Sequence, residues 1–174
     1  NIQPDQLVAV KNFFVEQKMG DVELFPMVRG RLTAINDAPV NPDNFTHPRA
    51  KGLAEREFNL SWADQLQVDN EIVAGRWWKN TSSVTAASSK GPAEFSVEEG
   101  IAKTLGIKLE DRLTYNIAGT EFTATVSSLR SVRWDSFHAN FFVLAPPGVL
   151  DDFPAGKDDC LPGEADAVVT ERAG

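Results

Sequence analysis

The sequence predicts an α+β protein in which helices pack on one face of a sheet of antiparallel and mixed strands, forming a two-layer sandwich. Three observations support this fold class. Apolar residues recur with helical spacing in one segment of each half of the chain, and each such segment is followed by segments that alternate in polarity. The chain has 174 residues, of which 42% are hydrophobic, so it is long enough and apolar enough to bury a core of ordinary size.

Composition excludes several classes of protein. A formal net charge of −8 and a pI near 4.8 argue against a nucleic-acid groove, which needs a basic stripe. The single cysteine, Cys160, excludes an intrachain disulfide and a cysteine-based zinc cage. No apolar run reaches the ~18 residues that a membrane-spanning helix needs. Because the sequence starts at Asn1 without an initiating Met or a signal peptide, we expect an excised part of a longer protein.

The N-terminal part of the chain predicts a helix, a long strand and a loop. Pro4 suits the first turn of a helix, and Gly20 suits its end. Alternation predicts a strand at 21–36, and Pro26 predicts that this strand lies at an edge or begins irregularly. The prolines and Asn/Asp residues of 37–52 predict a loop. One side of the strand carries Val22, Leu24, Val28 and Leu32, and the other carries Phe25, Met27, Arg29, Arg31 and Thr33.

A strand, a short helix and a hairpin are predicted between residues 95 and 126. Ser96 and Glu99 have the spacing of a capping box, which satisfies free N–H groups at a helix start. Gly106 suits a left-handed cap at the helix end. The alternating residues that follow reverse direction at Ala118-Gly119-Thr120, as a hairpin would. Further strands are predicted at 56–62, 70–78, 127–134 and 139–145.

The chain divides into one core domain and a tail. The core domain is predicted at 1–154, with a flexible Ser/Thr-rich insertion at about 79–93. Residues 155–174 combine turn residues and acids with almost no periodic apolar pattern, so they predict a weakly ordered tail.

Candidate catalytic and metal-binding residues are few. The residue types of a hydrolase triad occur close together in the sequence, at Asp135, Ser136 and His138. Side chains so near in one strand or turn cannot form a relay of nucleophile, base and orienting group. His47 is distant in sequence, and the two histidines lack the spacing of a transition-metal site. The acidic tail lacks the alternating ligands of a calcium loop. We therefore expect no catalytic residue, no metal and no cofactor.

Four residues form the candidate partner surface. Strand alternation places the adjacent Trp77 and Trp78 on opposite faces, so only one of them fits in the core, and Trp77 is preferred. The other ring is covered by local loops, such as the insertion after Lys79, or by a partner or ligand. Arg29 and Arg31 lie on the polar side of their strand, either solvated or paired with a partner.

An ordered set of segments resembles the extracytoplasmic domain of bacterial ABC transporter permeases of the FtsX-like or MacB-like family. Within that family the resemblance is strongest to the branch of lysophospholipase-linked export permeases, and it covers roughly residues 1–154. The segments are ELFPMVRGRLTAIN, EREFNLSW, IVAGRWW, FSVEEGIAKTLGIKL, SLRSVRWDSF and NFFVLAPPGVLDDFP.

This resemblance implies a MacB-like periplasmic core on the outer face of the bacterial inner membrane. It implies a non-catalytic domain that docks a substrate or partner and transmits ATP-driven motion. The implied partners are the transmembrane remainder of the permease, a cytoplasmic ABC ATPase subunit, and a periplasmic protein or lipid-like substrate. The alternative is a free-standing periplasmic binding or hydrolytic protein with its site around Asp135, Ser136 and His138.

Overall fold

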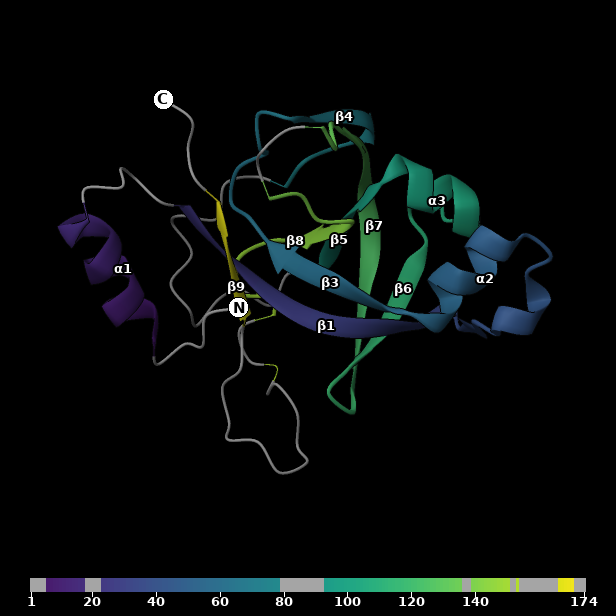
Figure 1. The fold of residues 1–174 in the computed structure, drawn as a ribbon. Helices are drawn as coiled ribbons and strands as arrows, with labels where there is room; N and C mark the ends of the chain where they lie inside the picture. The colour runs from purple at the N-terminus through teal and green to yellow at the C-terminus, as the bar shows by residue number, and fades with distance from the viewer. Residues whose placement is uncertain are drawn as a thin grey trace.

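The computed structural model describes residues 6–17, 23–78, 93–135, 139–150, 153 and 166–170 (Figure 1). Strands predominate, and the helices are short. In chain order the elements are α1 (Leu7–Glu16), β1 (Glu23–Ile35), β2 (Ala38–Pro39), the 3-10 helix η2 (Pro42–Asn44), α2 (Pro48–Glu55), β3 (Glu57–Trp62), β4 (Asn70–Gly75), β5 (Glu94–Glu98), α3 (Glu99–Leu105), β6 (Arg112–Ile117), β7 (Thr120–Val132), β8 (Val143–Ala145) and β9 (Asp166–Thr170).

Six of the strands close into a barrel. The ring runs β1–β3–β8–β5–β7–β6 and returns to β1, because β6 pairs antiparallel with both β7 and β1. Two neighbouring pairs, β3 with β8 and β5 with β7, are parallel. The α+β class is confirmed, but the predicted two-layer sandwich is wrong. A sheet closed on itself buries its apolar face inside the ring, so it needs no layer of helices over that face.

Alternation along the strands fills the barrel with apolar side chains. On β1, Val28 and Leu32 point inward, and on β6, Leu113, Tyr115 and Ile117 do the same. Gly30 faces inward between its neighbours, where an added Cβ would lie 3.0 Å from a Leu60 methyl. Further interior residues with no exposed surface are Phe58, Leu60, Phe95, Val97, Val126, Val143 and Ala145.

Helices α2 and α3 lie together at one end of the barrel (Figure 1). Helix α2 begins within the segment predicted to be a loop, 37–52, so that prediction is wrong for residues 48–52. His47 caps this helix, since its Nδ1 accepts the Arg49 N–H at 3.2 Å, and Pro48 occupies the first helical position. The prolines therefore start a helix here.

The start of α3 differs from the prediction, while its end agrees with it. Ser96 lies within β5, and the cap is Glu98, whose Oε2 accepts the Ile101 N–H at 2.7 Å. The predicted Ser96/Glu99 capping box is therefore wrong. Gly106 ends the helix with φ +75°, as predicted, and its N–H donates to the Ala102 carbonyl.

The predicted hairpin is confirmed between β6 and β7. Ala118 and Gly119 both have positive φ, which matches a tight two-residue reversal. The register between β5 and β7 shifts at Ser127, so a bulge joins the two strands that were predicted separately into one long strand.

Strand β9 pairs antiparallel with the first part of β1, from Glu23 opposite Thr170 to Met27 opposite Asp166. This strand lies within the segment predicted to be a weakly ordered tail, 155–174. The other residues of the tail, and the insertion predicted at 79–93 apart from Ala93, lie outside the described residues, so the division into domains stays a prediction. Within the described ranges, no helix is long and apolar enough to cross a membrane.

Candidate partner-docking site

Arg29 and Arg31 lie on the outward face of β1. Both side chains are exposed, and neither forms an ion pair with another described residue. Their neighbours across the ladder on β3 are Asn59 and Glu57. Two residues before Arg29, Met27 points to the same side of the strand but is buried. The outward face of β1 therefore changes from apolar and covered to cationic and open within one strand.

The chain leaves β4 at Gly75, before the tryptophan pair. Gly75 has φ +79°, and a Cβ at this position would lie 2.2 Å from the Ser127 carbonyl oxygen, so only glycine fits. The Arg76 N–H then donates to that same oxygen at 3.0 Å. The predicted strand is therefore too long. The prediction that Trp77 and Trp78 occupy opposite faces of a sheet is wrong for this reason.

The two indole rings stack on each other. Their centroids are 3.7 Å apart, with an angle of 32° between the ring planes. Trp78 Nε1 donates to the Ala63 carbonyl at 2.9 Å, and Trp77 Nε1 donates to the Asp64 carbonyl at 3.1 Å. Trp78 is only 5% exposed and Trp77 is half-buried, so the preference for Trp77 as the buried ring is also wrong. The turn after β3 anchors both indoles.

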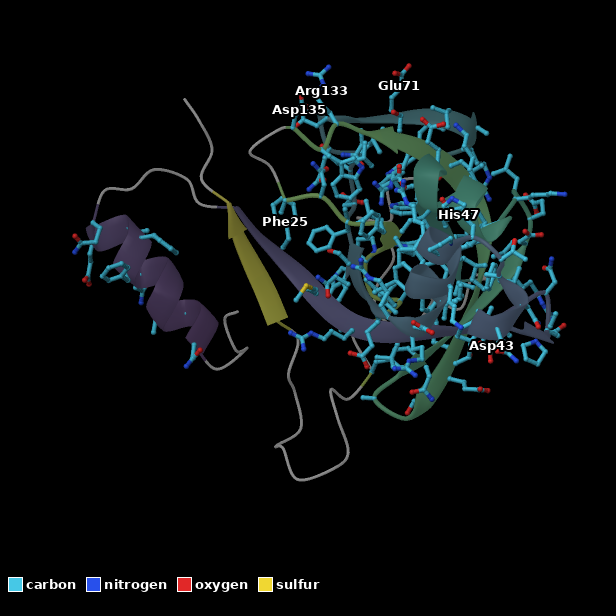
Figure 2. All side chains as sticks on the ribbon, turned by 45° about the vertical axis from the view of Figure 1, so that its right-hand side comes forward. Phe25, Asp43, His47, Glu71, Arg133 and Asp135 are labelled. Carbon is cyan, nitrogen blue, oxygen red and sulfur yellow. The ribbon has the colours of Figure 1, made fainter. Side chains whose placement is uncertain are left out.

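Trp78 belongs to a second apolar cluster outside the barrel, here called the tryptophan cluster. Phe25 of β1 packs against Phe141, with ring centroids 6.2 Å apart, and Figure 2 shows Phe25 near the start of β1. The cluster attaches the first part of β1 to the segment before β8 and to the turn after β4. Its buried members are Phe25, Met27, Trp78, Phe141 and Leu144, with Trp77 and Ala139 partly buried beside them.

A fully buried arginine lies next to this cluster. Arg130 of β7 has no exposed surface. Its guanidinium donates to Asn70 Oδ1 at 2.6 Å and to the carbonyl oxygen of Phe141. Asn70 Nδ2 in turn donates to Asn140 Oδ1 at 2.9 Å. Because Phe141 contributes its ring to the tryptophan cluster and its carbonyl to Arg130, the guanidinium fixes the backbone that positions the cluster.

Burial lowers the pKa of Arg130 to about 9, and the opposing effect of the Glu98 carboxylate does not compensate for it. Glu98 is the residue across the ladder from Arg130, and its carboxylate also caps α3. Arg130 therefore bonds β7 to β4 and to the segment before β8, and it lies opposite Glu98, which caps α3. Such a buried network specifies one arrangement of these elements and makes relative motion between them costly.

The structure brings part of the predicted partner surface together. Arg29 and Arg31 continue the strand face whose earlier residues pack on Trp78, and Trp77 is the more accessible of the two indoles. Sequence reasoning missed Arg130. One signal is its position in the strand. Arg130 is two residues from Ser128 and two from Val132, so the three side chains share one face, and Ser128 and Val132 are both buried.

The residues considered for catalysis do not form a site within the described part of the chain. Asp135 is exposed and lies near Arg133 at the end of β7, far from His47 (Figure 2). Ser136 and His138 lie outside the described residues. Among the described residues, no group of three His, Cys, Asp or Glu side chains could hold a metal ion.

Comparison with known proteins relates this chain to part of an ABC transporter permease. One similar protein is an uncharacterised ABC transporter permease, YbbP, from Escherichia coli (strain K12), which is 37% identical over 154 residues. The match covers 88% of this chain but only 17% of the permease, so the chain spans about a sixth of the length of that relative. No family model matches the chain.

Proposed function

We propose that this chain is a non-catalytic extracytoplasmic domain of an ABC export permease of the FtsX-like or MacB-like type. In this proposal the domain faces the periplasm and belongs to the branch linked to a lysophospholipase. Its partners are the membrane-embedded remainder of the permease and a cytoplasmic ATPase subunit. It docks a periplasmic protein or substrate and transmits ATP-driven movement to it.

The observation that carries the proposal is the antiparallel pairing of β1 and β9. Glu23 lies opposite Thr170, so the first residue of β1 and the last residue of β9 lie at the same end of the pair. A domain with this geometry can be inserted into a longer chain without separating the flanking segments. This agrees with a match to a relative of which the chain covers only 17%.

The construction of the body supports a role in transmitting movement. The barrel closes on itself, and the tryptophan cluster and Arg130 attach the first part of β1 to it. Polar side chains that resemble catalytic groups have structural partners, since His47 and Glu98 cap helices. A body joined in this way moves as a rigid unit, which is how hinge and shear transitions transmit motion.

The test uses the full-length permease with its ATPase and pairs of spin labels. One label at Asp43 and one at Glu71, both exposed and on separate elements of the body, report the distance within a single domain. We expect that distance to stay constant through the ATP cycle, while the distance between Glu71 and a label on the membrane-embedded part changes. A changing distance within the domain, or no change between domain and membrane part, would contradict the proposal.

Location and lack of catalysis are tested separately. In a variant with Cys160 replaced by Ser and Glu71 by Cys, a membrane-impermeant maleimide should label intact spheroplasts. Labelling only after lysis would place the domain on the cytoplasmic side. The isolated chain should hydrolyse neither ATP nor an activated short-chain ester, and turnover of the ester that Ser136→Ala abolishes would support the hydrolytic alternative.

A further inference from the structure

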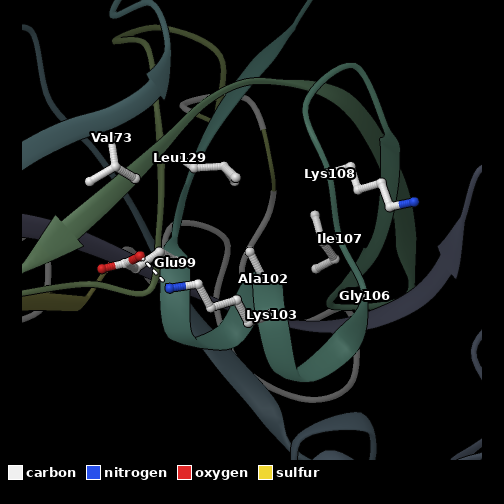
Figure 3. Close-up of a pocket in the computed structure, with 8 residues that line it drawn as sticks. All are labelled: Val73, Glu99, Ala102, Lys103, Gly106, Ile107, Lys108 and Leu129. Atoms are coloured by element: carbon white, nitrogen blue, oxygen red, sulfur yellow. Dashed lines mark hydrogen bonds and ion pairs between the residues drawn. The ribbon is translucent and has the colours of Figure 1, made fainter.

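A groove of about 470 Å³ lies between α3, β4 and β7, away from the tryptophan cluster. Its floor and walls are apolar and come from Val73, Ala102, Ile107 and Leu129. Figure 3 shows Val73 and Leu129 beside α3, with Ile107 just past the end of that helix. The volume falls within the range of small-molecule clefts.

A β-bulge shapes this groove. The register between β4 and β7 skips one residue, since Ile72 lies opposite Arg130 and Ala74 lies opposite Leu129. Val73 is the extra residue, and it stays 48% exposed although it is a large aliphatic side chain on a strand. A bulge redirects a side chain relative to the regular pleat, and here the redirected side chain forms the wall of the groove.

The rim of the groove is cationic, whereas the chain as a whole is acidic. Lys108 lies on the rim, is exposed and forms no ion pair with any other described residue. Lys103 also lines the groove, but it is neutralised by Glu99 at 2.6 Å, as the dashed line in Figure 3 shows. The Lys108 ammonium is therefore in no ion pair beside the apolar trough, although the Asp111 carboxylate accepts the backbone N–H of the same residue.

The three backbone N–H groups that follow α3 are already hydrogen-bonded. The backbone N–H groups of Gly106 and Ile107 both donate to the Ala102 carbonyl, and the Lys108 N–H donates to Asp111 Oδ2 at 2.7 Å. The carbonyl groups of a bound peptide could not accept from these N–H groups. They would lose their hydrogen bonds to water without replacement, which costs free energy. An alkyl chain needs no hydrogen bonds along its length.

We propose that this groove binds a single-chain anionic amphiphile of the fatty-acid class. The alkyl chain lies along Val73, Ala102, Ile107 and Leu129, and the carboxylate meets the Lys108 ammonium at the rim. This site is separate from the candidate partner surface and goes beyond the proposed function, because its occupation does not depend on whether the domain belongs to a permease.

The test is titration of the 174-residue chain with sodium dodecanoate below its micelle concentration, followed by calorimetry and by backbone amide spectra. We expect shifts confined to amides around the groove. Val73→Asp should weaken binding by about tenfold or more, because burying a carboxylate against the alkyl chain costs over ~1.4 kcal/mol. The matched control is Val68→Asp, since Val68 is 87% exposed and does not line the groove. It should leave binding unchanged.

A second variant separates the charge from the apolar trough. Lys108→Met keeps the aliphatic stem and should weaken dodecanoate binding by about two- to fivefold, the value of one exposed ion pair, while dodecan-1-ol binds this variant and the parent alike. Three results would overturn the proposal: no saturable binding of dodecanoate, equal loss in Val73→Asp and Val68→Asp, or shifts of the groove amides by an apolar peptide with a free carboxyl terminus but not by dodecanoate.

Discussion

Replacing Trp78 by Ala tests whether the tryptophan cluster holds the first part of β1 on the barrel. The change removes a ring that is 5% exposed, its stack on Trp77 and its hydrogen bond to the Ala63 carbonyl. Truncation of a buried aromatic side chain costs about 3–5 kcal/mol. With a denaturant slope of about 2 kcal/mol per M, the urea midpoint followed by circular dichroism should fall by about 2 M.

Two matched variants show which part of the side chain matters. Trp78→Phe keeps an aromatic ring but leaves the Ala63 carbonyl without its donor, so it should cost about 1–2 kcal/mol. Trp134→Ala removes a ring that is 48% exposed and packs against Phe142 at an angle of 46°, and it should cost about 1 kcal/mol. If Trp78→Ala were no more destabilising than Trp134→Ala, the cluster would not hold β1, and the reasoning would be refuted.

Three more perturbations test other features. Burial raises the pKa of Tyr115 above its usual 10.0. Its phenol is the only one in the chain, and above pH 10 it ionises only in the unfolded state, so stability should fall with rising pH and tyrosinate absorbance should appear together with unfolding. Gly75→Ala should cost about 3 kcal/mol or more in urea unfolding because its Cβ meets the Ser127 carbonyl oxygen and its φ is positive, whereas Gly52→Ala in α2, with nothing within 4 Å, should stabilise by about 0.5–1 kcal/mol. Arg130→Met leaves two buried acceptors unpaired and should lower the free energy of unfolding by about 2 kcal/mol or more; a variant as stable as the parent would show that the guanidinium is dispensable.

Local patterns predicted most of the individual elements. Alternation located the strands, because a period of two places Val28 and Leu32 of β1, and Leu113, Tyr115 and Ile117 of β6, on the faces that line the barrel. The closure of the barrel was not predictable in this way. It depends on β6 pairing with two strands that are distant from each other in sequence, and alternation within a strand carries no information about which edges meet.

The two errors at the candidate site have different causes, one local and one non-local. The alternation argument for the tryptophan pair assumed that β4 continues past Gly75, and the positive φ of that residue ends the strand. Arg130 was missed because a charged side chain in the buried phase of a strand looks exposed until its partners are known. Those partners, Asn70 and the Phe141 carbonyl, come from two other segments of the chain.

The pairing of β1 with β9 has a mechanical consequence. Hydrogen bonds between antiparallel strands run perpendicular to the strands, and Glu23 and Thr170 lie at the same end of this pair. A force that pulls those two residues apart opens the pair one hydrogen bond at a time, as in unzipping. A force that drives both strands in the same direction does not pull them apart, so it does not break these hydrogen bonds one by one. The pair is therefore suited to carry a push along the strands into the barrel, and it opens more easily when Glu23 and Thr170 are pulled apart.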